Sequence, residues 1–305
     1  MRVVVLMSTY QGEHYVREQI ASILAQLPAE GRLMIRDDGS ADATGTLIES
    51  IEDARISFVR GQNIGFARSF LALLADAPQD AEMFMFSDQD DVWLPTKIDR
   101  AWRVLRDASG PTLYFSRLRL VDEFLRPMGD SPRPARGPSF ENALAENIVT
   151  GCTIALNPAA RTLVLATGDQ RRIYFHDWWM YLVVSAFGKV VMDDEPTLLY
   201  RQHGNNVVGR GIGARRYLRN LSFVRRKSWV HIMFSQIENF RAVHGKSLAP
   251  SRRRLLESRF DPRRPSSVAR LILVPARHRQ RLLDEVLLRL LISWEIISGR
   301  GLLPK

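Results

Sequence analysis

The sequence is poor in cysteine and has no long apolar run, and each deficit narrows what the protein can be. Its 305 residues include a single cysteine, Cys152, so no disulfide can form within the chain and a reducing compartment is expected. No uninterrupted apolar segment approaches the ~20 residues that a transmembrane helix needs. The apolar start, residues 1–8, is too short for a signal peptide and has no small-residue cleavage site, so we expect it to form the first β-strand.

Two common phosphate-binding patterns are also missing. No G-x-G-x-x-G follows the first expected strand, and no G-x-x-x-x-G-K-[ST] occurs anywhere in the chain. This argues against a nicotinamide-cofactor fold and against a P-loop fold. The loop at residues 8–12 holds no Lys or Arg. A nucleotidyltransferase, which we keep as an alternative function, would normally need a basic triphosphate-binding loop near this point.

Charge is distributed unevenly along the chain. Residues 1–210 hold 22 basic and 27 acidic residues, whereas residues 211–305 hold 21 basic and 6 acidic residues. We therefore divide the chain into a catalytic domain, 1–210, and a basic amphipathic helical C-terminal region, 211–305. A basic region of this kind is expected to meet an anionic partner.

Short apolar segments alternate with segments that place apolar residues at helical spacing. This alternation predicts the α/β class, with a mostly parallel sheet flanked by helices on both faces. The expected strands are 3–7, 33–35, 56–59, 83–87, 112–116, 150–157, 189–192 and 197–200. Helices are expected at 15–27, 95–106, 140–147, 176–188 and 279–298 and within 215–244, and a mobile loop is expected at 122–138.

Three carboxylates follow the buried strand at 83–87, namely Asp88, Asp90 and Asp91. An acidic turn is the plain interpretation. Ligands, however, bind at the carboxyl edge of open α/β sheets, and Mg²⁺ is held by carboxylates together with substrate phosphates. The pattern therefore predicts a metal site facing a diphosphate.

Polar residues also follow the other strands of the first half: Thr9 and Tyr10, then Asp37 and Asp38, then Asn63. The carboxyl ends of parallel strands meet at one edge, so these side chains should converge on the acidic loop. Acids and amides with little lysine suit a nucleoside and a metal better than direct binding of phosphate.

The helix expected at 176–188 opens with His176, Asp177, Trp178 and Trp179. Asp177 can be a helix N-terminal acid or a working carboxylate. The two tryptophans can belong to the core or line a sugar site. His203 follows the strand at 197–200 in a polar turn with no evident packing role.

Taken together, these motifs resemble family 2 glycosyltransferases of the GT-A fold, and most of all the bacterial rhamnosyltransferases of polysaccharide assembly. The resemblance covers residues 1–210. Six motifs carry it in order: Ser8-Thr9-Tyr10, Asp37-Asp38-Gly39-Ser40, Asn63-Ile64-Gly65, Ser87-Asp88-Gln89-Asp90-Asp91-Val92-Trp93, His176-Asp177-Trp178-Trp179 and Arg201-Gln202-His203-Gly204-Asn205-Asn206.

The resemblance implies a role for each candidate residue. Asp177 matches the general base of inverting members, and Asp90, Asp91 and His203 match ligands of Mg²⁺ or Mn²⁺. The donor nucleotide is expected to contact Thr9, Tyr10, Asp37, Asp38, Asn63, Arg68 and Asp88. The acceptor or sugar pocket is expected to include Trp93, Gly151, His176, Trp178 and Trp179.

The expected function is therefore an inverting, metal-dependent glycosyltransferase. Its favoured donor is dTDP-rhamnose, followed by a UDP-sugar, and its acceptor is a growing glycan, expected to be lipid-linked. A catalytically silent nucleotide-sugar-binding scaffold is the other alternative. The C-terminal region is expected to lie on an anionic membrane, which would make this a peripheral enzyme on the cytoplasmic face of a bacterial plasma membrane. Packing on the catalytic domain or on a second subunit of a homodimer is nearly as well supported, and no nucleic-acid partner is expected.

Overall fold

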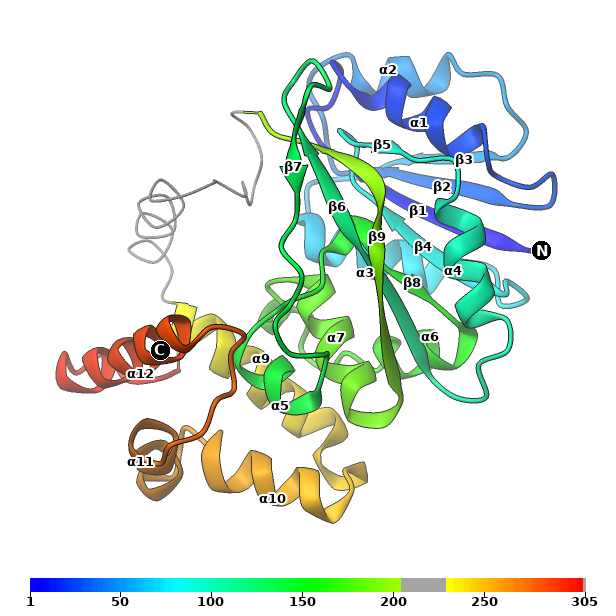
Figure 1. Cartoon of the computed structure of the whole chain (residues 1–305). Helices are drawn as coiled ribbons and strands as arrows, with labels where there is room; N and C mark the ends of the chain where they lie inside the picture. Colours follow the sequence, from blue (N-terminus) through cyan, green and yellow to red (C-terminus); the bar gives the residue numbers. More distant parts are fainter. Residues whose placement is uncertain (204–228, 304–305) are drawn as a thin grey trace.

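The computed structural model describes residues 1–203 and 229–303 and contains one nine-stranded mixed sheet with helices on both faces (Figure 1). The strand order is β3-β2-β1-β4-β8-β6-β9-β5, and β7 pairs with β6 outside this path. The strands are β1 (Val3–Thr9), β2 (Arg32–Asp37), β3 (Ile56–Arg60), β4 (Met83–Ser87), β5 (Val92–Trp93), β6 (Thr112–Val121), β7 (Pro127–Asp130), β8 (Ala155–Leu156) and β9 (Lys189–Arg201).

The first half of the chain forms the parallel part of this sheet. β1 pairs in parallel with both β2 and β4, and β3 pairs in parallel with β2. These strands are joined by α1 (Val16–Leu24), α2 (Thr44–Glu49) and α3 (Phe66–Asp76), and β5 leads into α4 (Lys97–Leu105). The four predicted strands and the convergence of their carboxyl ends are confirmed.

Alternation along β1 divides the interior into two cores, one on each face of the sheet. Val3, Val5 and Met7 are buried with the apolar residues of α1, α2 and α4. Val4 and Leu6 are buried on the other face, with apolar residues of α3, α6 (Pro158–Leu165) and α7 (His176–Phe187). Strand residues with period two serve opposite faces, so both cores are built on the same central strands.

The second half of the sheet differs from the sequence prediction at three places. The predicted strand at 150–157 is a 3₁₀ turn, Gly151–Thr153, followed by the two-residue β8. The strands predicted at 189–192 and 197–200 are one strand, β9, which follows β6 in parallel past register shifts at Ser116 and Arg117. The predicted loop at 122–138 contains β7, because the chain turns back and pairs with the end of β6.

The C-terminal helices cover α7 on the side away from the sheet. They are α9 (Trp229–His244), α10 (Pro250–Arg259), α11 (Pro265–Leu273) and α12 (Leu282–Ile297), and the short α5 (Phe140–Ala145) lies near α9. Trp229 stacks on Trp178 with ring centroids 4.9 Å apart, and Phe240 is fully buried in the α7 core. The part of the predicted 215–244 helix before Trp229 lies outside the described residues, and the division at residue 210 stays a prediction.

Gly188, which ends α7, gives a test of this architecture. A Cβ atom placed on Gly188 would lie 1.9 Å from the carbonyl oxygen of Pro111, and that oxygen already accepts a hydrogen bond from Lys189. Gly188→Ala should therefore force the α7–β9 corner away from the start of β6 and lower the free energy of unfolding by about 1–3 kcal/mol. Chemical denaturation measures this change. Gly137→Ala is the control because a Cβ atom there meets nothing within 4 Å; equal losses in the two variants would contradict the proposed clash.

Candidate active site

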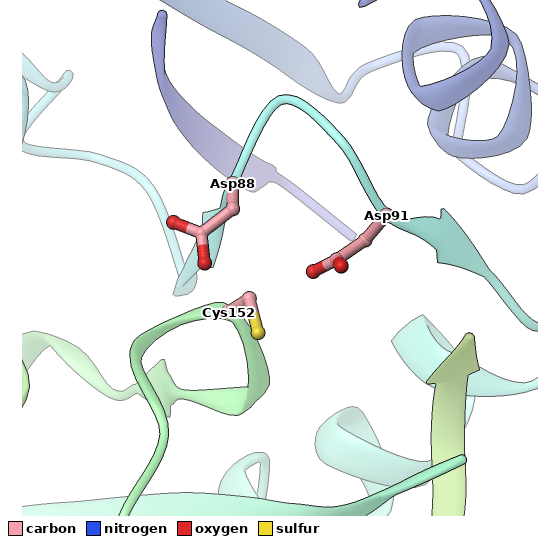
Figure 2. A group of neighbouring side chains, drawn as sticks. All are labelled: Asp88, Asp91 and Cys152. Carbon is pink, nitrogen blue, oxygen red and sulfur yellow. The ribbon is translucent and has the colours of Figure 1, made fainter. Parts of the chain in front are cut away.

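The acidic loop crosses from one half of the sheet to the other. β4 ends at Ser87 in the parallel half, and β5 begins at Val92 and pairs with β9 in the other half. Figure 2 shows Asp88 and Asp91 at the two ends of this loop, with the Asp91 carboxylate pointing towards Asp88 and the thiol of Cys152 below them. One donor atom from each of these three residues lies within 4.8 Å of the others. The fold therefore gathers the oxygen atoms of two carboxylates at one point.

Asp91 is the most deeply buried of the three acids, with 1% of its surface exposed. Its Oδ1 accepts a hydrogen bond from the backbone N–H of Arg201 at 3.3 Å, and its Oδ2 has no hydrogen-bond partner among the described residues. Burial, then the negative charges of Asp90 and Asp88, raises the pKa of Asp91 well above its usual range. Its carboxyl group therefore holds a proton readily unless a cation is brought next to it.

Asp88 is half-buried and shares this electrostatic environment. Removal from water, then the charges of Asp90 and Asp177, raises the pKa of Asp88 to about 7. Burial and the nearby Asp91 and Asp88 likewise raise the pKa of the Cys152 thiol well above its usual range, so the sulfur stays protonated. A protonated thiol is no ligand for a hard cation, and the useful ligand atoms here are the carboxylate oxygens.

Asp90 points to a different partner. Its Oδ2 lies 2.8 Å from Nε2 of His203, and the His203 ring lies 5.0 Å from the ring of Tyr15. The structure thus brings together Asp90 and His203, which are 113 residues apart in the chain. Of the predicted metal set, Asp90 and His203 are paired, and Asp91 lies with Asp88 at the adjoining group, so the assignment of Asp90, Asp91 and His203 as ligands stays a prediction.

Arg201 holds this loop from the end of β9. It is 3% exposed, and its Nε donates to the carbonyl oxygen of Asp90 at 2.9 Å. Its other guanidinium nitrogens donate to the carbonyl of Glu123 at 2.6 Å and to Glu18 at 2.5 Å. One buried cation therefore ties the acidic loop to α1 and to the segment after β6.

Lys97 supplies a second buried cation beneath the loop. It is fully buried, its Nζ donates to the carbonyl oxygen of Cys152 at 2.9 Å, and it lies 4.8 Å from the centre of the Trp93 ring. Burial lowers the pKa of Lys97 to about 8, against the opposing influence of Cys152, Asp91 and Asp88.

Trp93 is 3% exposed. In this conformation it contacts Lys97 and has little surface to offer a sugar, contrary to its predicted place in the acceptor pocket.

Asp177 lies in the first turn of α7, half-buried beside the acidic loop. Its Oδ1 accepts a hydrogen bond from the backbone N–H of Trp178 at 2.7 Å. The nearby side chain of Asn147 and backbone N–H of Gly151 favour its ionised form, while burial, the larger influence, raises the pKa of Asp177 to about 6. A carboxylate with a raised pKa in a fixed position is suited to accept a proton near neutral pH.

The other predicted pocket residues on α7 are buried. Trp178 and Trp179 are 1% and 0% exposed, and their indole N–H groups donate to the carbonyls of Ala143 and Val164. Since ten of the twelve α7 residues are buried, both rings belong to the core and not to a surface that meets a sugar.

His176 is stacked on Phe70 with centroids 4.2 Å apart, and burial lowers its pKa to about 3. Its Nε2 occupies the space that a Cβ on Gly151 would need, at 2.7 Å. Gly151 therefore permits the close approach of the turn to the start of α7, a packing role that brings the turn next to Asp177.

The nucleotide candidates divide into a buried group and an exposed group. Thr9 donates to Asp37 at 2.9 Å, and Asp37 also accepts from the N–H of Ser40 at 2.8 Å. Asp38 accepts from Arg36 at 2.5 Å and from the N–H groups of Ile64 and Gly65 at 2.9 and 2.8 Å. The side chains of Thr9, Asp37 and Asp38 thus hold three loop ends together at the sheet edge.

Tyr10, Asn63 and Arg68 form the exposed group at the same edge. The Tyr10 backbone is fixed by the Gln89 side chain, which accepts from its N–H at 2.8 Å and donates to its carbonyl at 2.9 Å.

Three residues that hold the site together, Gln89, Arg201 and Lys97, were not identified individually from the sequence. Gln89 and Arg201 stand inside quoted motifs, whereas nothing in the sequence marks Lys97 as buried.

The residues present fit a divalent cation. Asp88 and Asp91 each bring an oxygen within 4.8 Å of the other, the buried Oδ2 of Asp91 has no hydrogen-bond partner among the described residues, and all the useful donor atoms nearby except those of His203 are oxygens. Oxygen donors of this kind suit Mg²⁺ or Mn²⁺.

Comparison with known proteins places this geometry in a family. The glycosyl transferase family 2 model matches residues 4–157, slightly more than half of the chain. A dTDP-rhamnosyl transferase, RfbG of Shigella flexneri, is 28% identical over 260 residues, which cover 76% of this chain and 83% of the relative.

Two solved structures share the fold. TarS of Staphylococcus aureus, solved with UDP-GlcNAc, aligns over 98% of this chain and 92% of its own, with a TM-score of 0.55 and 15% identity. The mannosyltransferase PcManGT of Pyrobaculum calidifontis, solved with GDP-Man and Mn²⁺, aligns over 98% and 88%, with a TM-score of 0.51 and 13% identity. The described structure and the matched family model together show that this chain belongs to glycosyltransferase family 2 and has the GT-A fold.

Proposed function

We propose that this enzyme moves a sugar from a nucleoside diphosphate donor to a hydroxyl group of a growing cell-surface glycan, with inversion at the anomeric carbon. The observation that carries the proposal is the position of Asp177, a fixed carboxylate with a raised pKa that interacts electrostatically with Asp88 of the acidic loop. In this proposal Asp177 is the proton acceptor, and it lies next to the carboxylates that would face the diphosphate.

In the proposed reaction Asp177 accepts the proton of the acceptor hydroxyl as its oxygen forms a bond to the anomeric carbon. The bond from that carbon to the diphosphate oxygen breaks, and the nucleoside diphosphate leaves with the electron pair. Attack opposite the leaving group inverts the centre in one displacement. The hydrogen bond from the Trp178 backbone N–H holds the Asp177 carboxylate, and the nearby Asn147 side chain and Gly151 N–H favour its ionised form.

Asp88 and Asp91 would hold Mg²⁺ or Mn²⁺, with Asp90 and His203 beside them. A bound cation would neutralise negative charge on the leaving diphosphate. Without a cation, an acidic loop would repel a diphosphate. The presence of Mn²⁺ in the structure of PcManGT supports this cofactor.

We assign dTDP-rhamnose as the favoured donor and a UDP-sugar as the next choice. The support is the dTDP-rhamnosyl transferase of Shigella flexneri, which covers most of this chain. The exposed Tyr10, Asn63 and Arg68 are the proposed contacts of the nucleotide, and the buried Thr9, Asp37 and Asp38 keep the loops of that pocket in place.

The proposed acceptor is a lipid-linked glycan at the cytoplasmic face of the plasma membrane, where the enzyme would act as a peripheral protein. In the part of the chain that the structure describes, no helix has both the length and the apolar character of a membrane span. The basic C-terminal region is the part proposed to meet anionic lipid.

Asp177→Asn tests the base. The amide keeps the size of the side chain but cannot take up the proton, so turnover should fall at least about 100-fold while donor affinity changes less than about threefold. Donor binding by calorimetry and transfer by product release are measured on the same preparation. Asp107→Asn, which changes a side chain that is 79% exposed, is the matched control. Turnover within threefold of wild type in Asp177→Asn would exclude this residue as the base.

The raised pKa of Asp177 predicts a pH profile. The base must be deprotonated to act, and because burial raises its pKa to about 6, kcat/KM should fall as the pH decreases through about 6. An unperturbed aspartate would keep the rate constant down to about pH 4. Steady-state rates from pH 5 to 8 decide between them, and a flat profile would contradict the assignment.

A donor panel tests the cation and the sugar together. Heats of binding of dTDP-rhamnose, UDP-glucose, UDP-galactose, UDP-N-acetylglucosamine and GDP-mannose are recorded with and without Mn²⁺. We expect Mn²⁺ to tighten binding of dTDP-rhamnose at least about tenfold, and we expect Asp88→Asn and Asp91→Asn each to remove that gain. The Asp107→Asn variant should retain it. Tight binding of another donor would reassign the sugar, and metal-independent binding of every donor would remove the proposed role of the acidic loop.

A further inference from the structure

The outer face of α12 is apolar along its whole length. Every residue of α12 that is exposed is apolar. Five of these side chains are more than half exposed, namely Leu282 (65%), Leu283 (58%), Leu290 (60%), Trp294 (59%) and Ile297 (80%). The other three, Val286, Leu287 and Ile296, are exposed over less than half of their surface. At 100° per residue these eight side chains cover about half of the helix circumference. An apolar face of this size on a helix that is already packed on a domain indicates an interaction surface.

A neighbouring segment extends this face. Leu273 and Val274, at the end of α11, are 74% and 38% exposed. Arg289 of α12 donates to the carbonyls of Ile272 and Ala276 at 3.1 and 2.5 Å, so the two exposed residues lie on a segment that is tied to α12. We call the ten exposed apolar residues of α11 and α12 the apolar face.

The exposed charges of the C-terminal helices that carry the apolar face have one sign. Between residues 229 and 303 all the exposed charged residues are basic: Lys246, Arg253, Arg254, Arg263, Arg264, Arg270, Arg277, Arg281 and Arg300. The acids of the same range are buried or half-buried, among them Glu238, Asp261, Glu285 and Glu295. Glu238 and Asp261 are paired with arginines, and Glu285 accepts the backbone N–H groups of His278 and Arg279 at 2.9 and 3.0 Å.

We propose that the apolar face of α11 and α12 docks this enzyme on an anionic phospholipid bilayer, with the surrounding arginines on the headgroups. A bilayer surface needs apolar side chains that reach the acyl boundary and basic side chains at headgroup depth, and both are present. Trp294 stands within the apolar face, and an indole is favoured at the level of the headgroups.

A second copy of this chain or another protein fits the same surface less well. Protein interfaces carry a polar rim, with hydrogen bonds and pairs of opposite charge that set the register. Among the exposed residues of α12 there is no polar side chain, and acids are absent from the exposed charged residues of the described C-terminal helices. Two such faces brought together would bury apolar surface but oppose arginine to arginine.

The apolar face is held rigidly, so docking would orient the whole enzyme. Leu288 and Ile292 of α12 are fully buried, His231 of α9 contacts the carbonyl of Gly301 at 2.9 Å, and Glu146 accepts the N–H of Gln280 at 2.7 Å. In the view of Figure 1, β1 runs from the N terminus on the right towards the left, so its carboxyl end points to the side of the view on which α12 lies. The inference rests on the proposed function only for its purpose, which is to bring the site to a lipid-linked acceptor.

The test is cosedimentation of the full-length protein with vesicles. Wild type should pellet with vesicles of 70% phosphatidylcholine and 30% phosphatidylglycerol and bind pure phosphatidylcholine at least about tenfold more weakly. The double variant Leu290→Asp/Ile297→Asp should bind the anionic vesicles at least about tenfold more weakly than wild type, because it places charge where the bilayer is apolar. Arg277→Glu/Arg281→Glu should weaken binding without changing the apolar face. Val59→Asp, on β3 with 55% exposure, is the matched control and should bind as wild type does.

Three results would overturn the proposal. They are a wild type that does not pellet with anionic vesicles, an α12 double variant that binds as well as wild type, and a wild-type dimer that the α12 substitutions convert to monomer without lipid. Thermal melts of each variant confirm folding. Donor binding is measured in the absence of lipid, so failure of the proposed transferase activity and failure of membrane docking give separate results.

Discussion

Three carboxylates in a partly buried loop are the constraint on which the rest of this structure depends. Asp88, Asp90 and Asp91 repel one another, and removing them from water costs further free energy. The fold places cations and donors against them: the Arg201 guanidinium donates to the backbone carbonyl of Asp90, the Arg201 backbone N–H donates to the Asp91 carboxylate, and Lys97 lies buried within electrostatic reach of Asp88 and Asp91. These compensating groups come from β9 and α4, so the acidic loop can form only when both halves of the sheet have assembled.

The same contacts join the acidic loop to the proposed base. Lys97 donates to the carbonyl of Cys152, in the 3₁₀ turn that starts at Gly151, and the nearby N–H of Gly151 favours the ionised form of Asp177. A displacement of Lys97 would therefore shift the surroundings of Asp177, because only one turn of backbone lies between the two residues. Glycine at position 151 is required because His176 fills the space of a side chain there. The distance between the acids and the base is thus set by packing beneath the site and not by the exposed loops.

Sequence patterns predict the part of this arrangement that is local. The apolar run Val3–Met7 and the acids after β4 identify the sheet edge before any coordinates exist, because strand direction alone decides which loops converge. Tertiary features escape this reasoning. α7 is apolar on nearly every side, so its sequence cannot tell whether Trp178 faces a core or a ligand, and a lysine such as Lys97 is ordinarily exposed. The acidic run 193–195 interrupts the pattern of β9, which is continuous because β6 supplies its hydrogen bonds.

The division of charge along the sequence acquires a physical meaning in the folded chain. A diphosphate approaching the acidic loop needs a cation, so the many arginines of the C-terminal helices would be useful near the site. The exposed ones instead lie outside, while the acids of those helices are buried or half-buried, several of them in ion pairs or as acceptors of backbone N–H groups. Because the acids are covered and the exposed charges are all basic, the described C-terminal helices have a positive exterior that also carries an apolar face. That arrangement does little for donor binding, and it is well suited to an anionic surface that carries the acceptor.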